Sequence, residues 1–541
     1  APCKGGCPIH QDIPEYIELC RKGAYASALR LITEKNPLPF ITGTICAHNC
    51  MTKCMRNYYD EPVNIRATKL VAAEKGYDAY MSKITPPAPV TDGRKVAVIG
   101  GGPTGMSAAY FVGRAGIPVT LFEKADRLGG IVRQVIPAFR ISDEAIDKDV
   151  ALMEKMGVEV KLNTEAPSVA ELKAQGYTHI FFAVGAWKAG RLDIPGNVVP
   201  VIGWLRDMKA GKDVSLGHVA VVGGGNTAMD AARAALRAGA KSSTLVYRRT
   251  KKYMPADAEE LEMAIADGVE FLELVAPVEQ KDGKLICEKM KLGDPDDKGR
   301  RQPVPTGEMV EIPCDTVVSA VGEKVESEVF TRNGITVDEK GIPAFKTNLE
   351  GVYAGGDAMR GPATVVEGIA DAQYFANAVI GEAHKFAIPA KAVATREEAV
   401  AKKGVLCESA KCEGDRCLTC NVVCQVCADV CPNRANVVIE LPDGRQQILH
   451  VDRMCNECGN CAVFCPYDSA PYREKFTLFL TREGFDESVN NQGFLPLGGK
   501  KVLVRLDSKV FEADLDAKND LPADIEVFIW TVLTKYAYLM G

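Results

Sequence analysis

KVAVIGGGPTG, the stretch at residues 95–105, is the part of the sequence that decides the fold. An apolar run typical of a buried strand leads into Gly100, Gly102 and Gly105, which form the pattern G-x-G-x-x-G ahead of a helical pattern. The first glycine permits a tight turn, the second lets the backbone approach a pyrophosphate, and the helix N-terminus offers N–H groups to the anion. Glu123 ends the next apolar run, where a carboxylate can accept from a ribose hydroxyl. The stretch predicts a dinucleotide-binding fold.

A second glycine loop lies further along the chain, in the sequence HVAVVGGGNTA. It contains Gly223 and Gly225, and Ala228 stands in place of the third glycine, where it still allows close packing of helix on strand. The next predicted strand ends in Arg248 and Arg249, at the point where an NAD site carries an acidic residue. Two guanidinium groups suit a 2′-phosphate, so NADPH is favoured over NADH. The alternative is a solvated charge pair.

The order of the motifs predicts that the second nucleotide fold is inserted into the first. Short β-branched runs alternate with longer helical patterns, as expected for parallel sheets. The chain returns near Thr316 with TVVSAVGE and continues with GVYAGGD, which ends in Gly356 and Asp357. This distant motif favours FAD as the ligand of the first fold; the alternative is a strand followed by an ordinary glycine turn.

At 541 residues the chain is too long for one hydrophobic core, so several domains are expected. We predict a helical N-terminal iron–sulfur domain, two nested Rossmann-like α/β domains, and a C-terminal ferredoxin-like domain with two [4Fe–4S] clusters. The stretch at 385–405 is rich in Lys and Ala and is expected to be a linker helix. The predicted ranges are 1–85 for the helical domain, 94–210 and 316–385 for the FAD-binding domain, 211–315 for the NADPH-binding domain, 404–475 for the ferredoxin-like domain, and 476–541 for a tail of unknown role.

The bulk composition excludes several classes of function. The net charge of −6 is small for this size and argues against nucleic-acid binding, which needs clustered Lys and Arg. No apolar run is long enough to cross a bilayer, and residues 1–20 lack the apolar core of a signal peptide, so a cytoplasmic location is expected. Because Ala1 is not a methionine, we expect an upstream portion to be missing.

The 19 cysteines fall into two terminal groups, with only Cys287 and Cys314 between them. Disulfides would not be segregated in this way, so metal ligation by thiolates is the better explanation. Near the C-terminus, one run has the bacterial ferredoxin spacing C-x2-C-x2-C-x3-C followed by proline, and an earlier run repeats it with one extra residue in the first gap. The spacing predicts two clusters, one held by Cys420, Cys424, Cys427 and Cys465, the other by Cys455, Cys458, Cys461 and Cys431.

Two features of these cysteines leave alternatives open. Zinc could replace iron, but zinc sites usually use two separated pairs of ligands rather than two runs of four. Cys417 lies three residues before Cys420 and competes with it as a ligand. At the N-terminus five thiolates are available, whereas one cubane needs four and two need eight. Either one cluster forms with a spare cysteine, or two form with ligands from upstream and from a non-cysteine residue; the five are Cys3, Cys7, Cys46, Cys50 and Cys54.

These motifs carry a resemblance to a known family. Residues 1–385 resemble the small, NADPH-oxidising subunit of bacterial glutamate synthase and the matching half of dihydropyrimidine dehydrogenase. The motifs are CKGGCP, GTICAHNCMTKC, GGGPTG, GGGNTAMD, VYRR and AGGD. With the ferredoxin module at its C-terminal end, the chain looks most like selenate reductase flavoprotein subunits.

The resemblance implies ligands for both kinds of cofactor. Cys3 and Cys54 would share one cluster with a C-x-x-C pair upstream of Ala1, and Cys7, Cys46 and Cys50 would hold a second. The fourth ligand of that second cluster, a Gln or Glu in the family, falls at Lys69, and a lysine ammonium is a poor ligand. The implied FAD contacts are Gly129, Gly130, Asp357 and Thr364, and the implied NADPH contacts are Asn226, Thr227, Arg248 and Arg249.

Together these features predict an NADPH-dependent oxidoreductase that binds FAD and [4Fe–4S] clusters. No catalytic side chain is predicted, because the cofactors carry the chemistry. Electrons would pass to or from a partner redox subunit or a further domain of the same polypeptide. One alternative is a piece of a dihydropyrimidine dehydrogenase-like enzyme with its substrate site elsewhere. Another is a structural electron relay that no longer oxidises NADPH.

Overall fold

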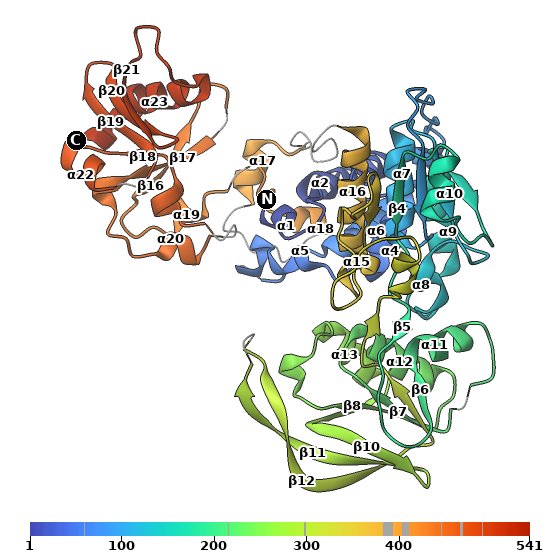
Figure 1. The fold of residues 1–541 in the computed structure, drawn as a ribbon. Helices are drawn as coiled ribbons and strands as arrows, with labels where there is room; N and C mark the ends of the chain where they lie inside the picture. Colours follow the sequence, from blue (N-terminus) through green and yellow to red (C-terminus); the bar gives the residue numbers. More distant parts are fainter. Residues whose placement is uncertain are drawn as a thin grey trace.

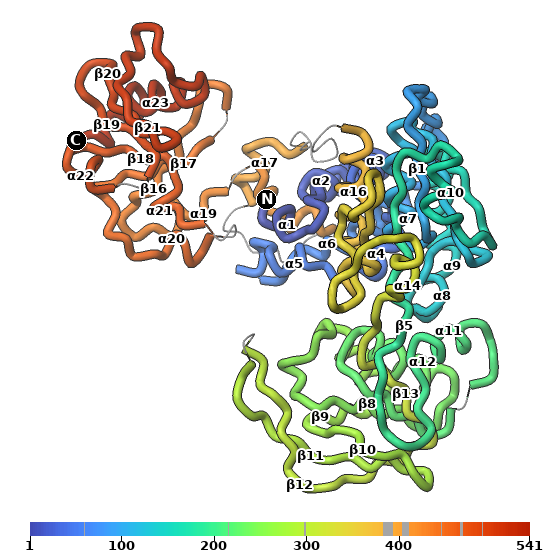
Figure 2. Tube along the Cα trace, viewed as in Figure 1, coloured from blue at the N-terminus to red at the C-terminus, as the bar shows by residue number. Residues whose placement is uncertain are grey.

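The computed structural model gives the fold in Figure 1, and Figure 2 follows the same path as a tube. The N-terminal helices lie between the first nucleotide fold and the C-terminal module, and the second nucleotide fold lies beneath the first in this view. The predicted linker at 385–405 lies partly outside the described residues, and the predicted boundaries at 385 and 404 lie wholly outside them. The structure describes the chain except residues 59, 215, 297–298, 382–392, 403–410, 423, 445, 466–468 and 489–490.

The N-terminal part is helical, as predicted. Asn64 caps the longest helix by accepting from the Ala67 N–H at 3.1 Å. Gly76 lets this helix approach α3, because a Cβ there would lie 2.5 Å from the Tyr25 carbonyl oxygen. The elements are α1 (Pro2–Gly5), α2 (Ile13–Arg21), α3 (Tyr25–Thr33), α4 (Pro39–Ile45), α5 (Asn49–Thr52), the 3-10 turn η1 (Met55–Tyr58) and α6 (Ile65–Met81).

The first nucleotide fold is a five-stranded parallel sheet with the strand order β15-β4-β1-β2-β3. Val96 of β1 pairs with Val119 of β2 and with His179 of β4. Its strands are β1 (Val96–Ile99), β2 (Val119–Phe122), β3 (Glu159–Lys161), β4 (His179–Phe182) and β15 (Val352–Ala354). Its helices are α7 (Pro103–Arg114), α8 (Gly130–Gln134), α9 (Asp143–Glu154), α10 (Val169–Ala174), α14 (Glu328–Thr331), α15 (Asp357–Arg360) and α16 (Val365–Ile380).

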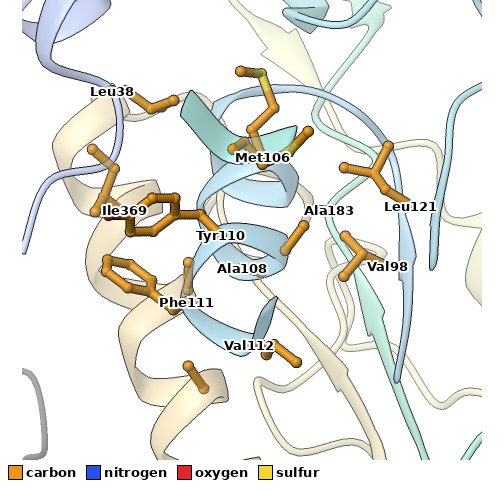
Figure 3. Packing of buried hydrophobic residues seen from close by; sticks show 14 of the residues in the cluster. Leu38, Val98, Met106, Ala108, Tyr110, Phe111, Val112, Leu121, Ala183 and Ile369 are labelled. Carbon is orange, nitrogen blue, oxygen red and sulfur yellow. The ribbon is translucent and has the colours of Figure 1, made fainter. Parts of the chain in front are cut away.

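Helix α7 lies at the centre of the main core. In Figure 3, Tyr110 and Phe111 face Ile369 of α16, whereas Val98 and Leu121 lie on the side of the strands. Burying one such side chain contributes about 1.5–3 kcal/mol. Leu38, just before α4, belongs to the same cluster, so the N-terminal helices and the first sheet share one core.

A buried carboxylate also joins these two parts. Asp149 of α9 accepts from the Phe40 N–H at 3.1 Å and from the Ile41 N–H at 2.8 Å. The N-cap of α4, Leu38, has no polar side chain, so Asp149 supplies the cap from outside the helix.

The second nucleotide fold is a five-stranded sheet with the order β6-β13-β7-β8-β9, and a three-stranded antiparallel sheet flanks it. The parallel strands are β6 (Val198–Pro200), β13 (Thr316–Ser319), β7 (His218–Val222), β8 (Ser242–Tyr247) and β9 (Glu270–Glu273). The flanking strands are β10 (Val275–Lys281), β11 (Lys284–Pro295) and β12 (Arg301–Pro313). The helical elements are α11 (Val201–Lys209), α12 (Asn226–Arg237), η2 (Lys251–Tyr253) and α13 (Ala258–Ala266). The strands β5 (Lys188–Ala189) and β14 (Glu323–Lys324), one on each crossing between the folds, pair antiparallel.

The sheets differ from the predicted ranges at two places. β13 begins the range 316–385, which was assigned to the first fold, yet it pairs with β6 and β7 of the second. β6 and α11 end the range 94–210 and also belong with the second sheet. A short buried strand has the same apolar pattern whichever parallel sheet it joins, so the sequence pattern could not assign these elements.

The C-terminal module is built on one six-stranded sheet in the order β16-β17-β18-β19-β20-β21. The stretch predicted as a separate tail, 476–541, continues this sheet, because β18 pairs in parallel with β17. The strands are β16 (Asn436–Glu440), β17 (Gln446–Val451), β18 (Thr477–Leu478), β19 (Gly493–Gly498), β20 (Lys501–Leu506) and β21 (Lys509–Asp514). The helices of residues 396–541 are α17 (Arg396–Ala401), α18 (Glu413–Arg416), α19 (Val426–Asp429), η4 (Asp452–Met454), α20 (Asn460–Val463), α21 (Pro471–Glu474), α22 (Arg482–Glu487), α23 (Ala523–Lys535) and η5 (Ala537–Met540).

Within the described ranges, none of the helices combines the length and apolar character that a bilayer crossing requires.

Candidate functional site

A cavity of about 470 Å³ lies between the two nucleotide folds. Its size falls within the range of small-molecule sites, roughly 300–1,000 Å³. The loop after β1 lines it from the first fold, and Asn226 and Thr227 at the start of α12 line it from the second. The cavity also reaches Ile45 and Ala47 of the N-terminal helical part. Parts of the chain that are far apart in sequence therefore meet at one site.

The first glycine loop is held tightly against the helix that follows it. Gly100 has a φ of +106°, and a Cβ there would lie 2.5 Å from the Ala183 carbonyl oxygen. A Cβ on Gly105 would collide with the Gly100 carbonyl oxygen. Gly102 is the N-cap of α7 and has no side chain that could cap it, so the first N–H groups of the helix are left for an anion. These features fit the pyrophosphate of a dinucleotide.

Glu123 lies beside this loop, buried and on the cavity wall. Its Oε2 accepts from the Gly101 N–H at 2.6 Å, and its Oε1 accepts from the Ala125 N–H at 2.8 Å. A carboxylate oxygen can accept more than one hydrogen bond, so both oxygens keep capacity for a ribose hydroxyl. The loop thus fixes the carboxylate at the place that the sequence predicts.

Asp357 and Thr364 line the cavity on the side of α15 and α16. Asp357 Oδ1 accepts from the Ala363 N–H at 3.1 Å. Burial, together with the nearby carboxylates of Glu323 and Glu367, raises the pKa of Asp357 to about 7. Near neutral pH this carboxyl group can therefore donate as well as accept a hydrogen bond. Thr364 caps α16 through the Glu367 N–H at 3.4 Å.

The remaining glycines proposed for FAD lie next to these groups. Gly130 is on the cavity wall, and Gly129 donates its N–H to the Gly101 carbonyl oxygen at 2.8 Å. Gly356 donates its N–H to Asp371 Oδ2 at 2.9 Å. Gly129 and Gly356 shape the site through the backbone without being part of its lining.

The residues proposed for NADPH are only partly brought to the cavity. Asn226 accepts from the Asp257 N–H at 3.0 Å, which orients its side chain beside the lining residue Thr227. Arg248 is exposed, and Arg249 donates to the Arg301 carbonyl oxygen and to Gln302 Oε1, both at 3.1 Å. The two arginines, Gly223 and Gly225 are not among the residues that line the cavity.

A buried ionic group that the sequence analysis missed joins the two folds. Arg140, just before α9, lies 3.1 Å from Asp230 Oδ1 on α12 and also pairs with Glu260 on α13. Arg140 and Asp230 line the cavity. Burial raises the pKa of Asp230 to about 6, whereas Arg140 opposes that rise. Asp230 belongs to the second glycine motif, GGGNTAMD, but Arg140 belongs to no motif, so the sequence could not reveal the pair.

Three of the N-terminal cysteines are neighbours. Burial, with Cys7 and Cys46 acting in the same direction and Lys69 against them, raises the pKa of Cys50 to about 12. Burial likewise raises the pKa of the Cys7 thiol, against which Lys69 acts. The structure therefore places Lys69 next to the trio Cys7, Cys46 and Cys50, where the family has a Gln or Glu.

The other two N-terminal cysteines, Cys3 and Cys54, line a second, small cavity together with Cys417 and Cys420. Burial raises the pKa of Cys3 well above its ordinary value, and Cys417, Cys420 and Cys54 raise it further. Burial also raises the pKa of Cys417 to about 11, with Cys54 acting in the same direction. The proximity of Cys420 to the N-terminal pair is not visible in any sequence spacing.

Other cysteines of the two predicted ferredoxin runs lie near one another. Cys427 has Cys424, Cys461 and Cys465 near it, and Cys455 has Cys461 and Cys431 near it. Two sulfurs accept backbone N–H groups, Cys431 from Ala435 at 3.2 Å and Cys455 from Glu457 at 3.3 Å. Cys458, the remaining member of the later run, is exposed.

Among the described residues, no group of three or more His, Cys, Asp or Glu side chains converges closely enough to hold a single metal ion. Four thiolates around a cubane bind four different iron atoms, so they surround a volume instead of converging on a point. The donor sets, composed of thiols alone, fit iron–sulfur clusters.

Comparison with known proteins identifies two family models in the chain. Residues 94–372 match the pyridine nucleotide-disulphide oxidoreductase model, and residues 1–79 match the model of dihydropyrimidine dehydrogenase domain II, 4Fe-4S cluster.

Several relatives match over two thirds or more of this chain. The oxidoreductase YgfK of Escherichia coli is 41% identical over 574 residues, covering 100% of this chain and 55% of that protein. The glutamate synthase [NADPH] small chain of E. coli is 31% identical, covering 70% of this chain and 88% of that protein. The beta subunit of the NADP(+)-dependent formate dehydrogenase of Moorella thermoacetica is 36% identical, covering 68% of this chain and 58% of that protein. The chain thus spans about half the length of YgfK.

Among solved structures, Mycobacterium tuberculosis FprA in complex with NADPH matches at 21% sequence identity and a TM-score of 0.45, covering 57% of this chain and 89% of that one.

Proposed function

Because the chain belongs to the pyridine nucleotide-disulphide oxidoreductase family, together with the small chain of glutamate synthase, we propose that it oxidises NADPH at a bound FAD and passes the electrons to [4Fe–4S] clusters. One observation carries this proposal: the glycine loop of the first fold and the start of α12 in the second line the same cavity. A site for a flavin and a site for a nicotinamide thereby face each other. The order and direction of transfer are part of the proposal.

The residues of the first fold would hold FAD. The uncapped N-terminus of α7 would bind the pyrophosphate, and Glu123 would accept from the ribose hydroxyls. Asp357 and Thr364 approach from the opposite wall, where the carboxyl group of Asp357 can donate or accept. When bound, FAD would take a hydride from NADPH, and its two electrons would reduce two one-electron clusters with release of NADP⁺ and one proton.

The residues of the second fold would position NADPH. Asn226 and Thr227 lie at the N-terminus of α12, which begins at Gly225 without a capping side chain. Arg248 is exposed at the end of β8, where its guanidinium is free to reach the 2′-phosphate of a nucleotide that extends beyond the cavity. The selectivity for NADPH over NADH would depend on this side chain and on Arg249.

The clusters would carry the electrons away from the flavin. Cys7, Cys46 and Cys50 would hold one cluster near Lys69, and Cys431, Cys455, Cys458 and Cys461 would hold another in the C-terminal module. The acceptor would be a partner subunit or a further domain, because the chain spans about half of YgfK.

Anaerobic mixing of the purified protein with NADPH tests this function. The flavin absorbance should bleach with NADPH and much more slowly with NADH at the same concentration. An unchanged flavin spectrum would support a structural relay instead. Equal rates with the two nucleotides would contradict the role of the arginine pair while leaving flavin reduction intact.

A further inference from the structure

Four buried or half-buried cysteines from the two ends of the chain lie around one small cavity. Cys3 and Cys54 come from the N-terminal helices, and Cys417 and Cys420 come from the segment that follows α18. The other lining groups include the apolar side chains of Ile13, Ile17 and Val63. The buried side chain of Arg56 also lines the cavity. The four thiols have the donor set of a [4Fe–4S] cluster, and the apolar groups around them shield the site from water.

Polar contacts hold the C-terminal segment against the N-terminal helices before Cys417. Arg416 donates to the Glu61 carbonyl oxygen at 2.6 Å and to Asp60 Oδ1 at 3.2 Å. Glu413 accepts from the Asn64 N–H at 2.8 Å.

A further contact follows the cysteine pair. Asn421 donates to Glu15 Oε1 of α2 at 2.9 Å. Gly414 packs so closely on α2 that a Cβ there would lie 2.6 Å from Arg21 Cβ. Because contacts flank the pair on both sides, Cys417 and Cys420 are fixed beside Cys3 by the fold and not by the sequence around them.

The spacing of the ferredoxin run supports the separation of Cys420 from it. If Cys424, Cys427 and Cys431 are the second, third and fourth positions of C-x2-C-x2-C-x3-C, the first position falls on Asn421. Cys420 is therefore one residue out of register with that run. With Cys417 it forms a separate C-x-x-C pair, which is the unit that a cluster shared with Cys3 and Cys54 requires.

We propose that Cys3, Cys54, Cys417 and Cys420 hold one [4Fe–4S] cluster that links the N-terminal helices to the C-terminal module. This assignment replaces the expectations that Cys3 and Cys54 share a cluster with an upstream pair and that Cys420 belongs with Cys424, Cys427 and Cys465. The last three cysteines remain as ligands of the second C-terminal cluster. The ligands of this bridging cluster are assigned independently of the proposed function, and only its role rests on that function. The role is to pass one electron at a time between the flavin and the C-terminal clusters.

A cycle of serine variants in the full chain tests the shared cluster. C3S/C54S and C417S/C420S should each lose about four iron atoms and four sulfides per FAD, the content of one cubane. The quadruple variant should lose the same four iron atoms and no more, because both pairs bind one cluster. A quadruple variant that lacks the iron of two clusters would overturn the proposal, as would full iron in either double variant.

C20S/C412S is the matched control. Cys20 and Cys412 are neighbours from the same two parts of the chain, but neither lines the cavity. This variant should keep all its iron. Retained FAD, together with flavin bleaching by NADPH in every variant, would show that the fold and the proposed function survive; loss of bleaching with normal iron would instead contradict the proposed function alone.

A measurement on the unmodified protein covers the case in which the variants do not fold. During anaerobic iron chelation, alkylation by iodoacetamide followed by peptide mass spectrometry should show all four cysteines becoming reactive at one rate. If Cys417 and Cys420 became reactive together with Cys424 and Cys427 while Cys3 and Cys54 remained protected, the shared cluster would be excluded.

Discussion

The two nucleotide folds have similar glycine loops, one after β1 and one after β7. The loops carry the same residues at the first two positions of the glycine pattern and different residues at the third. Gly100 and Gly223 both turn beneath the neighbouring strand, where a Cβ would meet the carbonyl oxygen of Ala183 or of Ala320. At the third position, Gly105 touches its own loop, whereas the second loop accommodates a buried alanine. Helix α7 therefore lies closer to its loop than α12 does, so the first loop tolerates no side chain at its third position.

The two folds differ again at the end of the strand after each loop. After β2, the carboxylate of Glu123 is buried and bound by the loop N–H groups. After β8, Arg248 is exposed. The first fold thus presents a buried acceptor that the loop holds in place, and the second presents an exposed cation. On the proposed function, this difference in charge would distinguish the two nucleotides.

The largest expected effect comes from adding a methyl group where helix α7 touches the glycine loop of the first fold. Gly105→Ala places a Cβ against the Gly100 carbonyl oxygen, so α7 must move away from its loop. We expect a loss of about 3 kcal/mol in unfolding free energy and a large loss of bound FAD. Thermal unfolding and the ratio of FAD to protein would measure both.

The reciprocal change in the second fold is the control. Ala228→Gly should cost about 1–2 kcal/mol, through the lower helix propensity of glycine and the loss of one buried methyl group, and should leave FAD bound. If the two variants behaved alike, the difference between the loops would have no energetic meaning.

A smaller effect is expected from Asp230 on α12. The corresponding helix of the first fold, α7, carries no acidic residue. Burial raises the pKa of Asp230 from 3.8 to about 6, so the folded chain binds this proton more tightly than the unfolded chain. The contribution of the bound proton to stability is complete below about pH 4 and is lost as the pH rises through 6. Relative to Asp230→Asn, the wild type should lose on the order of 2 kcal/mol between pH 4 and pH 7.

Thermal unfolding of both proteins across that pH range would measure this difference. Parallel curves for the wild type and the asparagine variant would show that Asp230 does not titrate in this window. The comparison of the two helices would then rest on packing alone.

The smallest effect concerns the exposed cation of the second fold. Arg248→Ala should raise the KM for NADPH about tenfold, equivalent to about 1.4 kcal/mol, and leave the KM for NADH nearly unchanged. Steady-state rates with an artificial electron acceptor would give both constants. A matching rise for NADH would mean that Arg248 supports the fold and does not contact a 2′-phosphate.

The sequence predicts features that depend on neighbouring residues and misses those that depend on distant ones. The order of strand, glycine loop and helix around Gly100 and Gly223 is local, and the structure contains it at both places. Strand β13 belongs to the second sheet because it pairs with β7, which lies nearly a hundred residues earlier in the sequence. A buried apolar run does not indicate which strand it will pair with.

The candidate site shows the same limit. Glu123 was identified because its place after a strand is part of a motif. The contact of Arg140 with Asp230 joins two folds, and although Asp230 belongs to the motif GGGNTAMD, Arg140 belongs to none. The approach of Cys417 to Cys3 joins the two ends of the chain, and the local spacing around Cys417 fits more than one ligand set.

Counting electrons tests the central claim most directly. The protein is mixed anaerobically with less than one equivalent of NADPH per FAD, frozen, and examined by electron paramagnetic resonance. The account predicts signals of reduced iron–sulfur clusters that approach two spins for each NADPH oxidised, with the flavin reoxidised. Bleached flavin without any cluster signal, or clusters that NADPH cannot reduce, would contradict it.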